Sequence, residues 1–414
     1  MPLSRNFDQM ISLLEIIRGG ESLGDLPGVL VSGGQTWTEM RRSSLHVLRD
    51  LGYGKTTLED IIEEEIEKLM QHIDENWLDT PLDVSEFFNV SVLASLWRII
   101  SGEQLKIDDS KLKKLLSHIR QMVKEFTNPL VQMSFESYWL SEFIHRFGIT
   151  SFNKVVKDTL DFVNDYIEIH KTKHIDGENP LTFIEAFLHK IQNTKDKDHP
   201  LYAERGILNL KNTLFDLFLA GSDTTSSTLN WAMLYMILNP EVQNKVRQEI
   251  NTNVGARRPK VSDRNNTPFT EAVIHEIQRK GNIAPVAVFH RTSKALNIGR
   301  FEIPEDSLII TNLGEILKDP EHFPDPQEFR PERFLTNEID GSLRFTPHQR
   351  MGPFGIGKRR CLGESLARMS LYKFLTSLVQ KYEIVSGQNS PIEDKYTTGF
   401  VLVPQPYKLK FRKL

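Results

Sequence analysis

The chain has 414 residues, of which 55 are acidic and 51 are basic, giving a formal net charge of −4. This near balance argues against a nucleic-acid-binding protein, which normally carries a strongly basic surface. Hydrophobic residues make up 39% of the chain and charged residues 26%, values that are ordinary for a soluble globular protein. The single cysteine excludes an internal disulfide and fits a reducing compartment.

The first nine residues are polar and lack the apolar segment of a signal peptide or membrane anchor. No later run approaches the roughly 20 apolar residues that a membrane-spanning helix needs. The longest apolar runs, 214–220 and 231–238, are short and are separated by serine and threonine residues. They therefore predict buried core helices.

Apolar residues recur at helical spacing along most of the first 280 residues, most regularly in segment 57–77. A further stripe of this kind follows the cysteine. The pattern predicts helices over 37–50, 57–77, 84–101, 108–126, 152–172, 181–194, 204–238, 240–252, 268–280 and 362–380. We therefore expect a helix-rich core over about 36–280 and 362–380.

The hydrophobic period changes after residue 281, where short alternating runs are separated by turn residues. These runs predict strands at 284–290, 295–303 and 307–311, in a β-rich and meander region that extends to residue 361. A terminal hairpin is expected over about 395–412. The chain is thus predicted to be one domain, 1–414, mainly α with small β-sheets.

The only cysteine, Cys361, lies between a glycine-rich loop and the predicted helix that follows it. A helix N-terminus and the flanking Arg359 and Arg360 favour thiolate over thiol. Free backbone N–H groups at such a position can donate to the sulfur and tune an attached metal. A lone cysteine can also be a small buried hydrophobic residue, so this position alone leaves both interpretations open.

The residues around the cysteine fit a ten-residue pattern, Phe354-x-x-Gly357-x-Arg359-x-Cys361-x-Gly363. This pattern resembles the haem-binding signature of the cytochrome P450 family, in particular its microsomal branch and the animal family-2 group. The resemblance runs from about residue 5 to the end of the chain. It implies the cytochrome P450 fold, a haem b cofactor, and Cys361 as the thiolate ligand of the iron. It also implies that Phe354, Arg359 and Gly363 contact the haem.

The same resemblance concerns the start of the chain. The microsomal branch normally begins with a membrane anchor, a proline-rich hinge, a first helix and sheet strands. We find no counterpart of these segments before residue 5, and we therefore expect an N-terminally truncated form of the fold.

Within the predicted helix 204–238, the stretch from Ala220 to Thr224 resembles the oxygen-activating segment of this family. The resemblance implies that Ala220 lies against the haem, that Gly221 leaves room beside the iron, and that Asp223 and Thr224 deliver protons. The residues by themselves allow another interpretation. The hydroxyl groups could bond to their own backbone, and the glycine could open the helix locally.

Other motifs match the family's positions for binding the haem propionates. These are Trp37 and Arg41 in W-x-x-x-R, His290 in the strand after E-x-x-R, and Arg359 before the cysteine. A lone histidine is as often an ordinary core or surface residue. The neighbouring Arg42 is expected to face solvent.

The E-x-x-R motif consists of Glu276 and Arg279, which lie three residues apart on one predicted helix and can form an ion pair. As a surface pair it would contribute at most ~1 kcal/mol to stability. The resemblance implies instead that the pair joins Arg333 in a triad that braces the core on the haem side.

As a whole, the resemblance implies a haem-thiolate monooxygenase that inserts one oxygen atom of O₂ into a lipophilic substrate such as a steroid, fatty acid or xenobiotic. The expected substrate-lining stretches are largely apolar. They comprise Phe215, Leu219, Ala220 and Thr224, then 283–288, then 399–401. A haem-thiolate isomerase or dehydratase, and an inactive haem-binding or misfolded fragment, remain as alternatives.

Electrons are expected from NADPH through NADPH-cytochrome P450 reductase, with cytochrome b5 as a further donor. The basic residues Lys358, Arg360, Arg368 and Arg49 could face the acidic surface of such a reductase, although an ordinary solvated face is nearly as good an interpretation. The resemblance implies membrane association on the cytosolic face of the endoplasmic reticulum. Without an anchor, the chain could also be cytoplasmic or peripheral.

Overall fold

The computed structural model describes residues 26–52, 56–106, 109–126, 128–134, 143, 150–172, 182–397 and 401–414. The expectations for residues 399 and 400 and for the start of the chain lie outside these ranges. Within the described residues, no helix is both long enough and apolar enough to cross a bilayer.

Helices dominate the described chain, as the hydrophobic periodicity predicted. The α-helices are α2 Gly34–Asp50, α3 Thr56–Asn76, α4 Asn89–Ser101, α5 Ser110–Phe126, α6 Pro129–Ser134, α8 Phe152–Thr172, α9 Phe183–Asn193, α10 Ala203–Leu238, α11 Pro240–Asn253, α12 Pro268–Gly281, α13 Leu313–Ile316 and α14 Glu364–Lys381. Short 3₁₀ helices are η1 Val261–Asn266, η2 Pro331–Phe334 and η3 Gly357–Arg359. Most predicted bounds agree within three residues.

The helix α4 is the exception, because it begins at Asn89 and not at residue 84. The Asp83 side chain accepts a hydrogen bond from the backbone N–H of Ser85 at 2.8 Å. Such a bond from an aspartate to the amide two residues on stabilises a turn and competes with helix formation. Residues 84–88 accordingly form a turn ahead of the helix.

The strands are short and form small antiparallel sheets. They are β1 Leu82–Asp83, β2 His290–Arg291, β3 Leu296–Ile298, β4 Phe301–Ile303, β5 Leu308–Ile309, β6 Leu335–Asn337, β7 Leu343–Phe345, β8 Tyr382–Ser386, β9 Tyr396–Thr397, β10 Val403–Pro404 and β11 Lys408–Lys413. The pairs are β2 with β5, β3 with β4, β6 with β7 and β9 with β10, and one three-stranded sheet has the order β1-β11-β8.

Three strand predictions were wrong. Segment 295–303 is not one strand, because it folds into the paired strands β3 and β4. Of segment 284–290 only His290 is in a strand, because the segment contains Pro285, which has no backbone N–H to donate. The predicted terminal hairpin is divided between two sheets. Its first part forms β9 and β10, whereas β11 pairs with β8, a strand that the periodicity did not predict.

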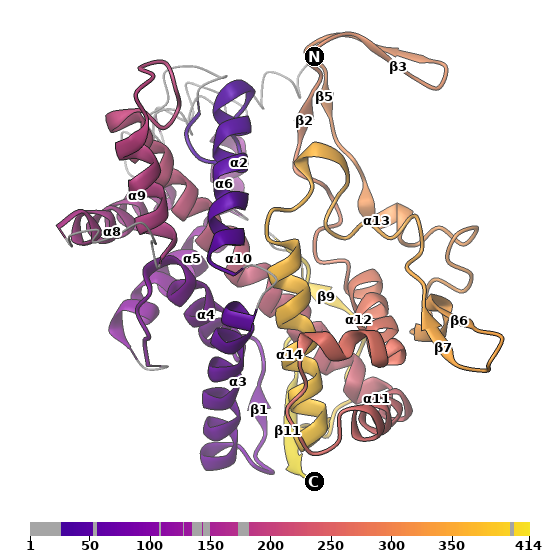
Figure 1. Ribbon diagram of the computed structural model, residues 1–414. Coiled ribbons are helices and arrows are strands. Elements are labelled where there is room, and N and C mark those ends of the chain that lie inside the picture. Colours follow the sequence, from indigo (N-terminus) through magenta and orange to yellow (C-terminus); the bar gives the residue numbers. More distant parts are fainter. Residues whose placement is uncertain are drawn as a thin grey trace.

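The helix α10 runs between two groups of elements. Figure 1 shows α2, α3, α4, α5, α8 and α9 on one side of the molecule, and α11, α12, α13 and most short strands on the other. The helix α14 lies at the centre of this view, in front of α10. The segment that leads into α14 lies between α2 and the strand pair β2–β5. Arg41 of α2 donates to the carbonyl of Arg360, so the cysteine lies close to α2.

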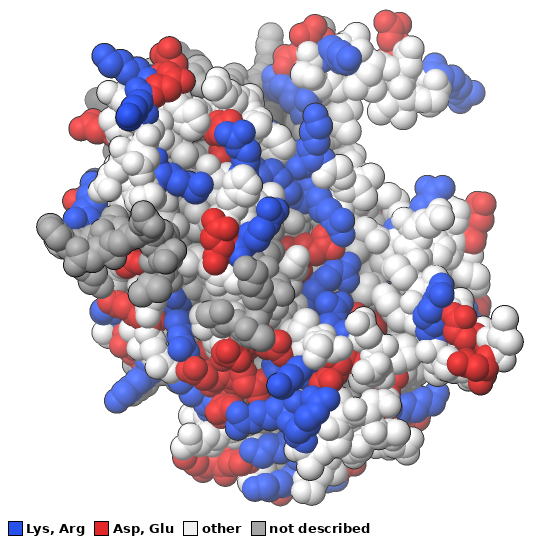
Figure 2. Space-filling model, viewed as in Figure 1, with Lys and Arg blue, Asp and Glu red and all other residues white. Residues whose placement is uncertain are grey.

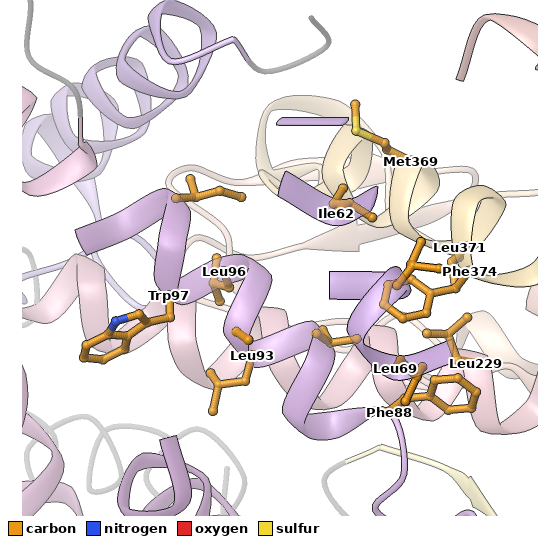
Figure 3. Packing of buried hydrophobic residues seen from close by; sticks show 14 of the residues in the cluster. Ile62, Leu69, Phe88, Leu93, Leu96, Trp97, Leu229, Met369, Leu371 and Phe374 are labelled. Carbon is orange, nitrogen blue, oxygen red and sulfur yellow. The ribbon is translucent and has the colours of Figure 1, made fainter. Parts of the chain in front are cut away.

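The main core joins α3, α4, α10 and α14. In Figure 3 the side chains of Phe88, Leu229 and Phe374 point toward one another from three separate parts of the chain. The rings of Phe88 and Phe374 meet edge to face, with centroids 6.1 Å apart. Such aromatic contacts add to the stabilisation from apolar burial, and they hold α14 firmly against the rest of the core.

The centre of α10 is an unbroken α-helix, so the expected local opening does not occur. Hydroxyl groups bond to the carbonyl four residues earlier: Ser222 to Phe218 at 3.1 Å, and Ser226 to Ser222 at 2.7 Å. These bonds satisfy the buried hydroxyl groups within the helix itself. The alternative that the cluster bonds to its own backbone is therefore correct for this part of α10.

Candidate haem and oxygen-activating site

The loop before α14 presents the cysteine at the start of that helix. Gly355 and Gly357 have φ angles of 73° and 74°, in the left-handed region that glycine adopts without strain. The backbone N–H of Cys361 donates to the carbonyl of Phe354 at 2.9 Å, which closes the loop. Gly363 is the N-cap of α14, so the sulfur lies at the N-terminal end of the helix, as predicted.

The sulfur of Cys361 can be reached by a ligand, because the residue is exposed. The surrounding atoms nevertheless desolvate the thiol, and this burial raises its pKa, while the backbone N–H groups of Gly363 and Glu364 and the charge of Arg41 act in the opposite direction. The expectation that the chain alone favours thiolate was therefore wrong. A metal ion bound to the sulfur would displace the thiol proton even though the pKa of the thiol is raised.

The cations nearest the sulfur also differ from the expectation. The guanidinium of Arg360 pairs with Glu364, and that of Arg359 donates to the Ser32 carbonyl at 2.9 Å. Arg360 still interacts electrostatically with Cys361, and Arg41, on α2, adds a second charge there and donates to the Arg360 carbonyl at 2.6 Å. A residue 320 positions away in sequence therefore supplies charge at the sulfur.

Trp37, Arg41 and Arg359 come together beside the cysteine loop. The guanidinium carbon of Arg359 lies 3.9 Å from the centroid of the Trp37 ring, and that of Arg41 lies 5.9 Å from it. Burial, followed by the nearby charge of Arg41, lowers the pKa of Arg359 to about 10. Two partly buried cations side by side are stabilised by an anion, so this cluster fits the carboxylates of a haem.

His290 and Arg42 lie outside this cluster. His290 is exposed on β2, where it is directly opposite Ile309 of β5. Among the residues that the structure describes, it has no hydrogen bond or ion pair with the Trp37 cluster, and its role remains a prediction. Arg42 faces solvent with 61% of its side chain exposed, as expected, and pairs with Glu39 at 2.6 Å.

The predicted oxygen-activating residues form part of the otherwise buried middle of α10. Ala220 is exposed, whereas Asp223 and Thr224 are half-buried. Burial raises the pKa of the Asp223 carboxyl, and the charge of Arg120 on α5 opposes this shift. The Thr224 hydroxyl donates to the Ala220 carbonyl at 2.7 Å. An acid that holds its proton more readily than usual thus lies next to an alcohol.

Gly221 differs from its expected role. A Cβ atom at this position would lie 2.9 Å from a terminal carbon of Leu96 on α4, closer than side chains normally approach. The glycine therefore allows α10 and α4 to pack closely. The room that it leaves is taken by Leu96, and the exposed small residue is Ala220.

Glu276, Arg279 and Arg333 form the predicted triad. Arg279 donates to Glu276 at 2.7 and 2.8 Å, and Arg333 donates to the same carboxylate at 3.2 Å. The side chains of Glu276 and Arg279 are 0% and 1% exposed, so the surface-pair interpretation is wrong. The triad ties α12 to η2, beside the segment that leads to the cysteine loop.

Of the expected substrate-lining residues, Phe215 and Leu219 are buried in a small core cluster with α8 residues such as Phe152. Core packing therefore accounts for these two. Val286 and Val288, in the segment after α12, are instead exposed. A flat apolar ligand is a suitable cover for such side chains.

Figure 2 shows a band of Lys and Arg side chains that runs from the strands β2 and β5 toward the start of α14. Of the residues predicted to face a reductase, Lys358, Arg360 and Arg49 are exposed. Arg368 is half-buried and is engaged by Glu364 at 2.9 Å and by His275 at 3.0 Å. Arg368 is therefore engaged mainly in contacts within the protein and contributes less to the exposed surface.

Sequence analysis missed how segment 26–33 is held near the site. The buried carboxylate of Asp216 on α10 accepts the backbone N–H groups of Val29 and Leu30 at 2.8 and 2.9 Å. Ser32, in the same segment, accepts from Arg359. An acidic residue within an apolar helix face was the available signal, because a buried carboxylate needs donors.

Comparison with known proteins accounts for this arrangement. The family model described as Cytochrome P450 matches residues 21–411. The chain belongs to the cytochrome P450 family. It is 35% identical over 384 residues to "Cytochrome P450 2J3" of Rattus norvegicus, covering 92% of this chain and 74% of that protein. It is 34% identical over 383 residues to "Cytochrome P450 2J2" of Homo sapiens, with the same coverage.

A third relative, "Cytochrome P450 2C15" of Oryctolagus cuniculus, is 34% identical over 392 residues, which cover 93% of this chain and 99% of that protein. The predicted fold class and the animal family-2 resemblance are thereby confirmed. As a cytochrome P450, the chain is a haem-containing oxidoreductase of the monooxygenase class. The isomerase and inactive-fragment alternatives have no support in these comparisons.

The residues present fit a thiolate-ligated haem. One reachable sulfur accepts two backbone N–H groups, two desolvated guanidiniums lie beside it, and exposed apolar side chains follow α12. Cys361 would hold the iron, and Arg41, Arg359 and Trp37 would hold the carboxylates.

Proposed function

We propose that this protein hydroxylates a lipophilic organic molecule, such as a steroid, fatty acid or xenobiotic, with haem b as its cofactor. When bound, a thiolate-ligated haem iron supplies the activation of O₂, in which electron donation from the sulfur favours cleavage of the O–O bond. The observation that carries the proposal is the placement of Cys361. Its sulfur accepts the N–H groups of Gly363 and Glu364 and lies next to Arg41.

The chain's own residues divide into three tasks. The N–H groups at the start of α14 orient the Cys361 sulfur and moderate its negative charge. Arg41 and Arg359 bind the two carboxylates of the cofactor, and Trp37 holds the Arg359 guanidinium against its ring face. The triad of Glu276, Arg279 and Arg333 keeps the surrounding backbone in place without touching the reacting atoms.

Asp223 and Thr224 are assigned to proton delivery. Since burial raises the pKa of Asp223, its carboxyl retains a proton more readily than an exposed aspartate does. The Thr224 hydroxyl donates to the Ala220 carbonyl and keeps lone pairs that can accept a further hydrogen bond. The alcohol can therefore receive a proton from the Asp223 side and pass its own toward the exposed face at Ala220.

The electron source in this proposal is NADPH, through NADPH-cytochrome P450 reductase and with cytochrome b5 as a second donor. The exposed residues Lys358, Arg360 and Arg49, together with the basic band that Figure 2 shows, support docking of an acidic protein surface. The resemblance to the microsomal branch supports association with the endoplasmic reticulum membrane.

The carbon monoxide difference spectrum of the reduced protein tests the proposal. We expect a thiolate-type Soret band for the unaltered protein and its loss in Cys361→Ala. We also expect NADPH-dependent hydroxylation of a lipophilic substrate with added reductase, reduced in Asp223→Asn although the spectrum is retained. A Cys361→Ala protein with an unchanged spectrum would show that the sulfur is not the ligand.

Adjacent arginines provide a matched control for the carboxylate-binding cluster. Arg41→Gln should weaken haem retention at least several-fold, measured by transfer of haem to apomyoglobin. Arg42→Gln removes the same charge from the solvent-facing neighbour and should leave retention unchanged. Equal effects of the two substitutions would contradict the assignment.

A further inference from the structure

A second group of metal-ligating side chains lies away from the haem site, at the turn that follows α13. The ligand atoms of Asp319, Glu321 and His322 all lie within 4.8 Å of one another. The nearest imidazole and carboxylate atoms, His322 Nε2 and Asp319 Oδ2, are 3.9 Å apart. This separation is too long for a hydrogen bond. Two ligands bound at about 2.1 Å in a tetrahedral site lie roughly 3.4 Å apart, so a small movement of either side chain would bring both onto one ion.

The turn itself is held in place by the backbone. The N–H of Phe323 donates to the Asp319 carbonyl at 2.8 Å, and Asp319 Oδ1 accepts the N–H of Glu321 at 2.9 Å. Phe323 is buried and anchors the turn in the core cluster of Phe334. The three ligand groups are therefore presented from a fixed backbone.

A second imidazole lies beside this group, on a separate segment of the chain. The ring of His348 lies with its centroid 6.1 Å from that of His322 and 4.7 Å from that of Phe323. In a tetrahedral site with Zn–N bonds of about 2 Å, two bound imidazoles have centroids roughly 5 Å apart, so the His348 ring would move about 1 Å closer to bind the same ion.

We propose that this junction is a binding site for a divalent metal ion, and that Zn²⁺ is the ion it prefers. Asp319, Glu321 and His322 already lie together as ligands, and His348, next to them, would complete the set. Two imidazoles and two carboxylates form a mixed nitrogen and oxygen set that suits Zn²⁺ better than Ca²⁺ or Mg²⁺, which favour oxygen alone. The site is distinct from the cofactor site at Cys361.

Binding through His348 also exchanges one hydrogen bond. His348 Nδ1 accepts the backbone N–H of Arg350 at 3.2 Å, so its free nitrogen is Nε2. Metal binding through Nε2 places the ring proton on Nδ1, and the exposed amide of Arg350 then turns to water. This exchange replaces a long hydrogen bond at the surface and does not disturb buried groups.

The ion would join two segments that lead to the haem site. Residue 348 lies four positions before Gly352, at the start of the cysteine loop. The turn at residue 319 follows Leu317, whose carbonyl accepts from Arg279 of the buried triad at 3.0 Å. A bound ion would therefore fasten the start of the cysteine loop to the braced core, and it would stabilise the folded chain in proportion to its occupancy.

Isothermal titration of the tag-free, haem-loaded protein with ZnCl₂ tests this proposal, with Asp319→Asn, His322→Gln and His348→Gln as variants. We expect one site of unit stoichiometry, weakened at least tenfold by each substitution. His199→Gln is the matched control, because His199 also faces a carboxylate, Glu39, at 3.5 Å, but belongs to no group of three ligands. The control should bind Zn²⁺ as the unaltered protein does.

The proposal is overturned if the unaltered protein shows no such site, or if the ligand variants bind Zn²⁺ as tightly as the control. Should a variant fail to fold, crystals of the unaltered protein soaked in ZnCl₂ decide the matter. An anomalous peak at the zinc edge, about 2.1 Å from the His322 and His348 nitrogens, is expected. A peak elsewhere, with none at this turn, refutes the assignment.

Discussion

Replacement of Arg279 by methionine tests the energetic role of the buried triad. The substitution removes both bonds to Glu276, at 2.7 and 2.8 Å, and the bond to the Leu317 carbonyl at 3.0 Å. The Glu276 carboxylate stays buried and keeps only part of its set of donors. Removing one partner of a buried ion pair costs about 3–5 kcal/mol, a large part of a typical stability of about 5–15 kcal/mol.

A pair with the same sequence spacing provides the control. Glu168 and Lys171 on α8 are also three residues apart and lie 2.7 Å from each other, but their side chains are 54% and 36% exposed. Lys171→Met should cost no more than about 1 kcal/mol, because solvent already screens the pair.

Urea unfolding followed by circular dichroism measures the difference. With a slope of about 3 kcal/mol per molar, the Arg279→Met midpoint should fall by about 1 M relative to Lys171→Met. Combining Arg279→Met with Glu276→Leu should cost about 1–3 kcal/mol less than the sum of the single changes. Midpoints for Arg279→Met and Lys171→Met that agree within error would refute the reasoning.

Two further predictions concern the attachment of segment 26–33 and the pH dependence of stability. Asp216→Ala removes the carboxylate that accepts the Val29 and Leu30 N–H groups, and it should lower the free energy of urea unfolding by about 2–4 kcal/mol. Asp216→Asn keeps one acceptor oxygen and should lower it by less. Equal losses for the two variants would contradict this account. Burial, followed by the charge of Arg368, lowers the pKa of His275 from its ordinary 6.5 to about 3. Between these two pH values, the unfolded chain binds a proton at His275 that the folded chain does not bind. His275 therefore does not lower the free energy of unfolding above about pH 7. As the pH falls below this value, the free energy of unfolding decreases by up to roughly 1.4 kcal/mol per pH unit. The His275→Gln protein should show a shallower decline of its urea midpoint between pH 7 and 4.5, and an unchanged slope would refute the assignment.

Much of the helical framework follows from short-range information. The 3.6-residue period and the prolines at 240 and 268 predicted α10, α11 and α12 within a few residues, because these signals act between neighbours along the chain. Short strands were predicted less well. The strand β8 has only five residues, too short a run to predict from its own pattern, and its partner β11 lies more than 20 residues later.

The sequence by itself determined the class of this protein, through a motif of closely spaced residues around Cys361 whose local geometry the loop and α14 impose. Only the tertiary structure decided which charges act on that sulfur. The neighbouring Arg360 pairs with Glu364 while its charge still acts on the sulfur, and the distant Arg41 adds a second charge. Likewise, Gly221 accommodates Leu96, a contact that no spacing within α10 could reveal. The physical reason is that charge and packing act through space, and a local pattern contains no information about which distant side chains the fold brings near.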